Sequence, residues 1–235
     1  MSVTFTPKRT VRCQPLLAAD RPVAGPRMAA AFHDDPAIQY LLPNRMRRPA
    51  QLMWLMSTFV AYGARYGQVT VAGETPVGTA ICLPSELATA SLYRLLRCGW
   101  GRAPYKLGWA ACCRLHTLTR TVQRQRLRLM SGRHLYLLHL SVSPACQGEG
   151  IGGALLDAVL EDAASQQLPC CLETFRVANL GFYMRHGFAL LSEARLADVD
   201  LPFWILGRPG RHPGSSPEHK GVRTFAAPLG SHLHI

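Results

Sequence analysis

The feature that most constrains the fold is the stretch "SVSPACQGEGIGGALLDAVL", from Ser141 to Leu160. An apolar run precedes it, four glycines fall within residues 148–153, and an amphipathic segment follows. Glycine loses more backbone freedom on folding than any other residue, so such a cluster needs a compensating role. Consecutive glycines at the start of a helix expose several backbone N–H groups, which together with the helix dipole bind anions. The stretch therefore predicts a strand, an anion-binding loop and a helix, with a pyrophosphate as the natural ligand.

Two other phosphate-binding motifs share this spacing and are disfavoured. Gly148, Gly150 and Gly153 match the G-x-G-x-x-G fingerprint of dinucleotide-binding folds, and Glu173 lies about where the ribose-binding acid is expected. In that fold, however, the first glycine follows the strand almost at once, whereas five residues separate Val142 from Gly148 here. A P-loop would end in Gly-Lys-Ser/Thr, which is absent. A glycine-rich helix start without any ligand remains as the third interpretation.

The rest of the sequence alternates between strand and helix patterns. Residues 48–66 form the clearest helix, because Leu52, Leu55 and Met56 share one face and Gly67 ends it. Residues 134–144 read as a central strand, apolar on both faces. The remaining expected elements are strands in 10–17, 169–175, 188–196 and 202–209, a hairpin in 68–84, and helices in 20–35, 85–130, 151–167 and 178–187. The tail from 210 to 235 is rich in Pro, Gly, Ser and His and is expected to be disordered.

Charge is distributed unevenly along the chain. The formal net charge is +12, and residues 87–133 hold ten basic side chains and no carboxylate. Such a field attracts anions, including nucleic acid, anionic lipid or a polyphosphate cofactor. Arginines on a helix face are nevertheless most often simply solvated.

Several classes of protein are disfavoured by composition. The sequence has neither an apolar run of about 18 residues nor the apolar core of a signal peptide. The eight cysteines show no metal-ligand spacing, so we expect reduced thiols, no metal and a cytoplasmic location.

Two motifs together resemble the GNAT superfamily of N-acetyltransferases. "QGEGIG" is similar to the Q/R-x-x-G-x-G/A motif, with Gln147, Gly150 and Gly152 at its defined positions. "LETFRVANLGFYMRHGF" resembles the strand and helix that follow, and it looks most like the subgroup of puromycin N-acetyltransferase. Gly181 stands where that subgroup has proline. The close match spans residues 135–209, and a looser one extends back to Val11.

The resemblance implies a fold, a cofactor and a set of binding residues. The fold would be α/β, with a mixed, splayed central sheet flanked by helices and a helical insertion before the central strand. The cosubstrate would be acetyl-CoA, with its pyrophosphate on the loop and its pantetheine arm along the central strand. The cofactor-binding residues would be Leu140, Val142, Gln147, Gly148, Glu149, Gly150, Ile151, Gly152, Gly153 and Asn179. For the side chains of Leu140 and Val142, packing in the core is an equally good description.

Tyr183 and Glu173 are the candidate catalytic residues. A phenol with a pKa near 10 can donate a proton to a departing thiolate with a pKa of about 8.5. Glu173, at the end of a strand beside the expected cofactor cleft, is the candidate base, and an ion pair with an arginine is its alternative role. His139 is a weaker candidate base. Asp34 and Asp35 could attract a cationic substrate, but "DDP" more often starts a helix.

The sequence thus predicts one acetyltransferase domain over residues 1–209, with a basic helical insertion over 85–133. It would transfer an acetyl group to a primary amine, expected to belong to a small molecule. A protein or peptide acetyltransferase, a non-catalytic CoA-binding module and a basic-surface binder are the alternatives. Nucleic acid is not an expected partner, no membrane span is expected, and a homodimer is left open.

Overall fold

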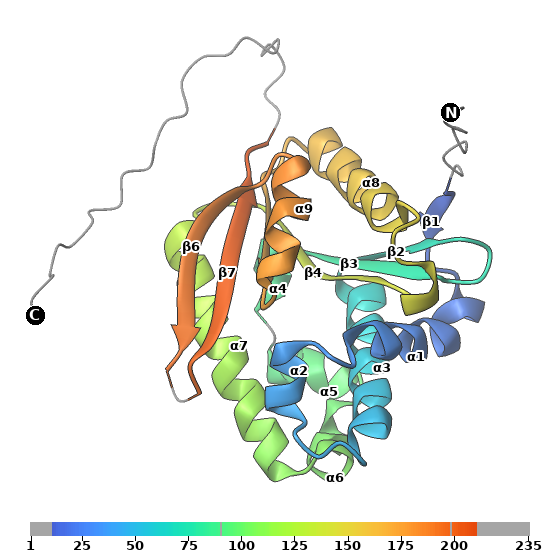
Figure 1. Ribbon diagram of the computed structural model, residues 1–235, viewed down its shortest axis with the longest axis vertical. Helices are drawn as coiled ribbons and strands as arrows, with labels where there is room; N and C mark the ends of the chain where they lie inside the picture. The colour runs from blue at the N-terminus through green and yellow to red at the C-terminus, as the bar shows by residue number, and fades with distance from the viewer. Residues whose placement is uncertain (1–10, 90, 198, 211–235) are drawn as a thin grey trace, which may run out of the picture.

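The computed structural model describes residues 11–89, 91–197 and 199–210, and these residues contain a single seven-stranded sheet (Figure 1). The strand order is β1-β2-β3-β4-β5-β7-β6, and every neighbouring pair is antiparallel except β4 and β5. The sheet is therefore mixed, as expected. The strands are β1 (Cys13–Pro15), β2 (Gln68–Ala72), β3 (Gly78–Pro84), β4 (Leu135–Val142), β5 (Cys170–Thr174), β6 (Ala189–Leu196) and β7 (Leu201–Arg208). The tail predicted to be disordered lies, from residue 211 onward, outside the described residues.

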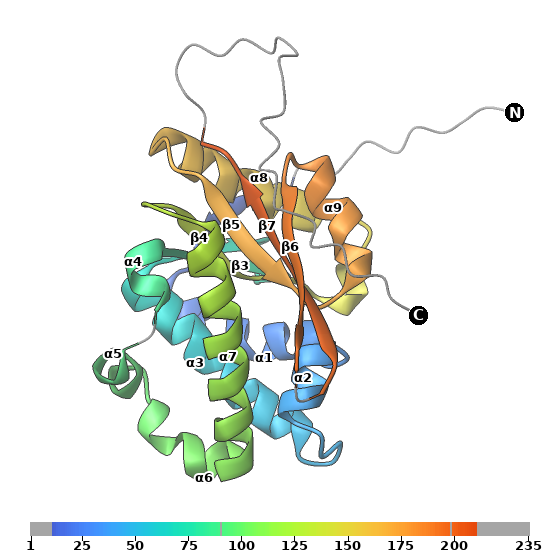
Figure 2. The same cartoon turned by 90° about the vertical axis from the view of Figure 1, so that its left-hand side faces the viewer.

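Helices cover both faces of the sheet (Figures 1 and 2). One face carries α8 (Ile151–Ser165) and α9 (Leu180–Arg185). The helices of the other face are α1 (Arg21–Phe32), α2 (Pro36–Leu41), α3 (Arg48–Tyr66), α5 (Leu92–Arg97), α6 (Ala103–Leu107) and α7 (Trp109–Leu129). The one-turn helix α4 (Ser85–Ala88) follows β3 directly. Each face has its own hydrophobic core, so the sheet is buried on both sides.

Helix α3 shows how closely the sequence pattern matches the structure. Leu52, Leu55, Met56 and Val60 are all at most 1% exposed, and the helix ends at Gly67, as its pattern predicts. The predicted hairpin forms as β2 and β3, and Gly187 adopts φ +84° after α9, as expected of a residue that ends a helix.

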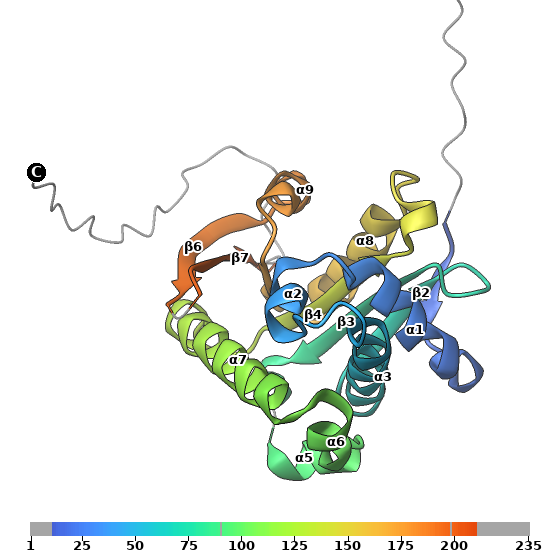
Figure 3. The same cartoon turned by 60° about the horizontal axis from the view of Figure 1, so that its bottom comes forward.

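Within the described residues of 85–130, the predicted helical segment forms four α-helices and one short 3-10 helix (Trp100–Arg102). Gly99 and Gly108 each adopt φ +86°, a conformation that interrupts regular helix, and they separate α5, α6 and α7. Arg114 on α7 donates to the carbonyl oxygen of Leu41 at 3.1 and 2.8 Å, which ties α7 to the end of α2. The segment is thereby held over the sheet as part of the same layer as α2 and α3 (Figure 3).

An irregularity in β4 decides the shape of the sheet. Ile81 of β3 pairs with His139 and Cys82 pairs with Leu137, so Leu138 has no partner on β3. A residue inserted in this way is a β-bulge, which bends its strand and increases its twist. Leu138 and His139 consequently both pack toward the α1–α3 side, although consecutive strand residues normally point to opposite faces.

The strands β4 and β5 separate just at this bulge. Their parallel pairing runs over Leu135–Cys170, Tyr136–Cys171 and Leu137–Leu172 and then stops. Beyond that point β4 continues along β3, and β5 continues along β7. The result is a wedge in the middle of the sheet, with one open edge on each strand. This wedge is the splayed region of the central sheet that the sequence resemblance implies.

The packing of α3 against the sheet gives a first prediction. A Cβ atom on Gly63 would lie 2.5 Å from Ile81 Cγ2 and 2.9 Å from Val69 Cγ2. Gly63→Ala should therefore destabilise the protein by about 1–3 kcal/mol in urea unfolding, as overpacked cores do. Gly101→Ala is the matched control, because its Cβ would meet only Leu96 Cδ2 at 3.4 Å. Equal midpoints for the two variants would contradict the close contact between α3 and the sheet.

Candidate active site

The glycine loop lies at the wide end of the wedge, between β4 and α8. Gly148 and Gly150 adopt φ +86° and +83°, so both positions require the left-handed conformation that glycine accepts without strain. Gly150 is also the N-cap of α8. Within the described part of the chain, the six backbone N–H groups from 148 to 153 make no hydrogen bond. Free donors at the start of a fifteen-residue helix suit a phosphate group.

The end of β4 offers an unpaired strand edge next to this loop. Leu140 pairs with Ala80 and Val142 with Gly78 on the β3 side, but neither pairs with β5. The side chains of both pack against the α8 core. Gln147 donates from Nε2 to the carbonyl oxygen of Val142 at 3.2 Å, which fastens the loop to the strand end.

A cavity of about 630 Å³ extends from the wedge into the helical layer. Leu138, His139 and Leu140 line it from β4, and Glu173, Thr174 and Phe175 line it from the end of β5. Further walls come from α1, α2, α3 and the segment α4–α7. The candidate catalytic residues Tyr183 and Glu173 both line this cavity, together with Asn179. Residues far apart in the sequence therefore line one cavity.

Tyr183 is buried, with 8% of its surface exposed, and packs against the rings of Phe182 and Phe188. Burial raises the pKa of its hydroxyl above the usual value, and the nearby Glu173 carboxylate raises it further. The phenol therefore keeps its proton at neutral pH. Its hydroxyl makes no hydrogen bond to any of the described residues, so the proton is not committed to another protein group.

Glu173 is held by two residues that the sequence analysis did not single out. The Tyr136 hydroxyl donates to Oε1 of Glu173, and Nη1 of Arg126 lies 4.0 Å from Oε2. The Arg126 guanidinium also stacks on Tyr136, with Cζ 3.6 Å from the ring centroid. Burial raises the pKa of Glu173, while Arg126 and Tyr136 oppose that rise. The rise brings the pKa of this carboxyl group closer to neutral pH, and a general base is most effective when its pKa lies near the working pH.

Asn179 lies at the N-cap of α9, one helical turn before Tyr183. Its Nδ2 donates to Thr174 Oγ1 at 3.1 Å, so its amide closes the turn between β5 and α9. Asn179 therefore lies beside the cavity and stabilises the turn between β5 and α9.

His139, the weaker candidate base, lies within an aromatic cluster. Its ring is 4.7 Å from that of Phe59 and 5.3 Å from that of Phe32. Burial lowers the pKa of His139 to about 4, so the ring is neutral at physiological pH. Its Nε2 is buried and has no hydrogen-bond partner among the described residues. This geometry fits His139 as part of the cavity wall better than as a general base.

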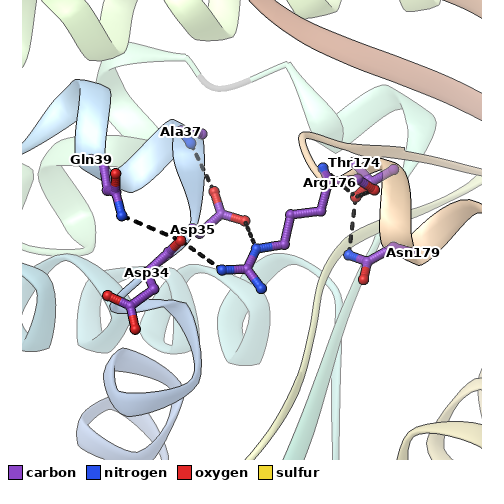
Figure 4. A network of polar contacts seen from close by, with 7 residues as sticks. All are labelled: Asp34, Asp35, Ala37, Gln39, Thr174, Arg176 and Asn179. Carbon is purple, nitrogen blue, oxygen red and sulfur yellow. Dashed lines mark hydrogen bonds and ion pairs between the residues drawn. The ribbon is translucent and has the colours of Figure 1, made fainter.

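Asp34 and Asp35 join the α1–α2 connection to the turn after β5 (Figure 4). Oδ1 of Asp35 accepts from the backbone N–H of Ala37 at 2.9 Å, so Asp35 caps α2, as the "DDP" pattern suggests. Its Oδ2 lies 3.8 Å from Nε of Arg176, which also donates to the carbonyl oxygen of Asp34 at 2.6 Å. Asp34 is exposed and contacts the neighbouring His33. These contacts bridge two segments that border the cavity.

Arg126 is not among the site residues that the sequence predicts, although α7 carries an apolar stripe that includes Leu118 and Val122. Leu118, Val122 and Arg126 are spaced four residues apart, so extending the stripe by one turn places Arg126 on the buried face. A cation there requires a buried carboxylate, and Glu173 at the end of a buried strand is the evident candidate. By contrast, Arg120, Arg124 and Arg128 are exposed, and of these only Arg120 borders the cavity.

All eight cysteines are free thiols, four of them buried. In the described ranges, no set of three or more His, Cys, Asp or Glu side chains is arranged to hold a metal ion. Nor does any helix in those ranges combine the length and hydrophobicity needed to cross a membrane.

Part of the chain matches a known family model. The family model described as an acetyltransferase (GNAT) domain matches residues 107–190, from the end of α6 into β6. This stretch includes α7, β4, the glycine loop, β5 and Tyr183. Residues 107–190 are therefore similar to a GNAT acetyltransferase domain.

Solved structures share the fold over most of the chain. One is described as histone acetyltransferase HPA2 and related acetyltransferase from Corynebacterium glutamicum. Its TM-score is 0.66 and its sequence identity is 22%, and the match covers 87% of this chain and 99% of the solved chain. A second is arylalkylamine N-acetyltransferase 2 from Aedes aegypti, with a TM-score of 0.57 and 11% identity, over 86% and 99% of the two chains. At these identities the likeness concerns the fold alone.

The buried ion pair generates a prediction about Glu173. Arg126→Met removes the cation and keeps an unbranched side chain over Tyr136. The pKa of Glu173 should then rise by about one unit or more, because an opposite charge within about 4–6 Å favours the carboxylate. Carbon-13 NMR titration of labelled glutamates measures this, with Glu173→Gln assigning the signal. Arg124→Met, on the exposed face of the same helix, is the control and should leave the titration unchanged. An unshifted Glu173 in the Arg126 variant would show that the pair is not coupled.

Proposed function

We propose that this GNAT-domain protein transfers the acetyl group of acetyl-CoA to a primary amine of a small molecule, with Tyr183 as general acid and Glu173 as general base. One observation carries the proposal. The wedge between β4 and β5 joins a loop of free backbone donors to a cavity that both side chains line. A donor held in the wedge and an acceptor held in the cavity would meet beside Tyr183.

The cofactor half of the site follows from the backbone. The N–H groups of residues 147–153 are proposed to hold the pyrophosphate, assisted by the dipole of α8. The amides of the pantetheine arm would pair with the open edge of β4 near Leu140 and Val142, as an added strand pairs with a sheet edge. Asn179 would act by keeping the β5–α9 turn in place.

Tyr183 is suited to protonate the leaving group. The amine nitrogen attacks the thioester carbonyl carbon, the C–S bond breaks, and the departing thiolate takes the phenolic proton. A phenol whose pKa is raised by burial stays protonated until that moment. The hydroxyl also has no competing acceptor among the described residues.

Glu173 is suited to remove the proton that the amine must lose. For an alkylammonium with a pKa near 10.4, the neutral form at pH 7 lies roughly 4.6 kcal/mol uphill, from about 3.4 pKa units. Oε1 of Glu173 is occupied by Tyr136, and Oε2 is shielded from solvent. We therefore propose that the proton reaches Glu173 through a water molecule, a route that general bases commonly use.

The cavity volume of about 630 Å³ is that of a pocket for a drug-sized molecule, which favours a small acceptor over a protein. A peptide substrate would need an open groove, and this alternative is retained because the GNAT fold serves both kinds of acceptor. The finer resemblance to puromycin N-acetyltransferase rests on "LET", "NLGFY" and "GF". A cytoplasmic location, a homodimer and the domain limits 1–209 remain proposals.

The first prediction tests the cofactor. Acetyl-CoA and CoA should raise the melting temperature of the protein in a concentration-dependent way, because a ligand that binds only the folded state stabilises it. NAD and NADPH, which lack the pantetheine arm, should give a clearly smaller shift. A shift with NAD but none with CoA would overturn the assignment of the loop.

The second prediction tests the chemistry. Tyr183→Phe keeps the ring and removes the hydroxyl, so kcat should fall by about 10²–10⁴, the usual contribution of a general acid. Thiol release from acetyl-CoA over a panel of amines measures this, and acetyl-CoA affinity should change little. Tyr105→Phe, at a residue 88% exposed, is the matched control.

Glu173→Gln in the same assay should behave differently. Raising the pH should recover part of its lost rate, because more of the amine is then already neutral. Full activity of Tyr183→Phe across the pH range would show that another group protonates the thiolate.

A further inference from the structure

The walls of the cavity are mostly apolar and aromatic. Phe59 makes edge-on contacts with Trp100, at 5.7 Å between ring centroids, and with His139, at 4.7 Å. Phe32 contacts the same histidine from α1, and Phe175 adds a ring from the end of β5. Because the His139 ring is neutral, this wall carries no charge. Aliphatic side chains from α2, α3, α5 and α7 complete it.

The carboxylates of the cavity are already engaged. Asp35 and Glu173 are the only two among the lining residues in the described part of the chain. Asp35 caps α2 and faces Arg176, while Glu173 accepts from Tyr136 and lies beside Arg126. Neither is left to neutralise a second ammonium group of a bound molecule. A buried cation without such a partner is strongly disfavoured.

The cavity opens beside α7. Among its lining residues, His116, Thr119 and Arg120 are exposed, so they mark the side that meets solvent. Arg120 adds a positive charge there, in a segment that contains no carboxylate from residue 87 to 133. A molecule with several positive charges is repelled more strongly at this opening than a molecule with a single ammonium group.

We propose that the acceptor is a monoamine with a bulky apolar body that includes an aromatic ring, rather than a polyamine, an aminoglycoside or a peptide. This inference rests on the proposed function and specifies its substrate class. About 630 Å³ is in the range of pockets that enclose drug-sized ligands, so the body can be considerably larger than a single ring. The apolar surroundings also lower the pKa of the bound ammonium, which eases its deprotonation.

Two adjacent cysteines on α7 provide a matched test. Cys112 lines the cavity and is half-buried, whereas Cys113 is exposed and is not part of its lining. Cys112→Trp fills the cavity, and Cys113→Trp adds the same bulk on the solvent side. Thr119→Trp, at the exposed opening, serves as a second filling variant that leaves the core undisturbed.

Calorimetric titration of the wild-type protein, without acetyl-CoA, compares 2-(2-naphthyl)ethylamine with ethanolamine, spermidine and a tripeptide. The naphthyl amine should bind at least tenfold more tightly than each of the others. Cys112→Trp or Thr119→Trp should weaken its binding by at least tenfold and leave CoA binding unchanged, while Cys113→Trp should change neither. Tighter binding of spermidine or the tripeptide, or equal effects of the two cysteine variants, would overturn the inference.

Addition of acetyl-CoA separates this inference from the proposed function. If the naphthyl amine binds as described but no thiol is released, the substrate class of the cavity stands and the acetyl transfer fails. If thiol is released with spermidine and not with the naphthyl amine, the transfer stands and the inferred acceptor class is wrong.

Discussion

The loss of pairing between β4 and β5 is the constraint on which the rest of the site depends. Three residue pairs hold the two strands together, and the bulge at Leu138 then turns β4 away. Had the pairing continued, the cavity would be filled by strand backbone, and neither an open edge nor a space beside Glu173 would exist. The gap costs hydrogen bonds between strands, and a ligand with amide groups can restore them.

A second constraint is electrostatic. Arg126 and Glu173 are both withdrawn from water at the wall of the cavity. A buried pair of this kind is rarely a net source of stability, because desolvation offsets the attraction. The pair instead positions a charged group: Arg126 favours the carboxylate form of Glu173, and Tyr136 fixes its orientation. Burial of apolar side chains in the two large cores that flank the sheet offsets the desolvation of the pair.

Local signals in the sequence predicted what depends on local structure. The period of α3, the β2–β3 hairpin, the glycine loop and the cap at Asp35 all follow from neighbouring residues. The bulge at Leu138 was not predictable, because it results from pairing with a strand more than fifty residues away. The coupling of Arg126 to Glu173 was missed for the same reason. The cavity was also not predictable, since an empty space depends on how helices and strands from distant parts of the chain pack around it.

The glycine loop and much of the cavity wall lie in different parts of the sequence, which has an evolutionary consequence. The glycine loop and the open edge of β4 belong to residues 135–153, whereas much of the cavity wall comes from residues 83–126. The proposed cofactor-binding residues and a large part of the proposed acceptor-binding wall therefore lie in two separate stretches of the chain. Substitutions in residues 83–126 would change the shape and polarity of the cavity and leave the glycine loop and the open edge of β4 intact. Proteins with this fold would thus acquire a different cavity while keeping the same loop and strand edge.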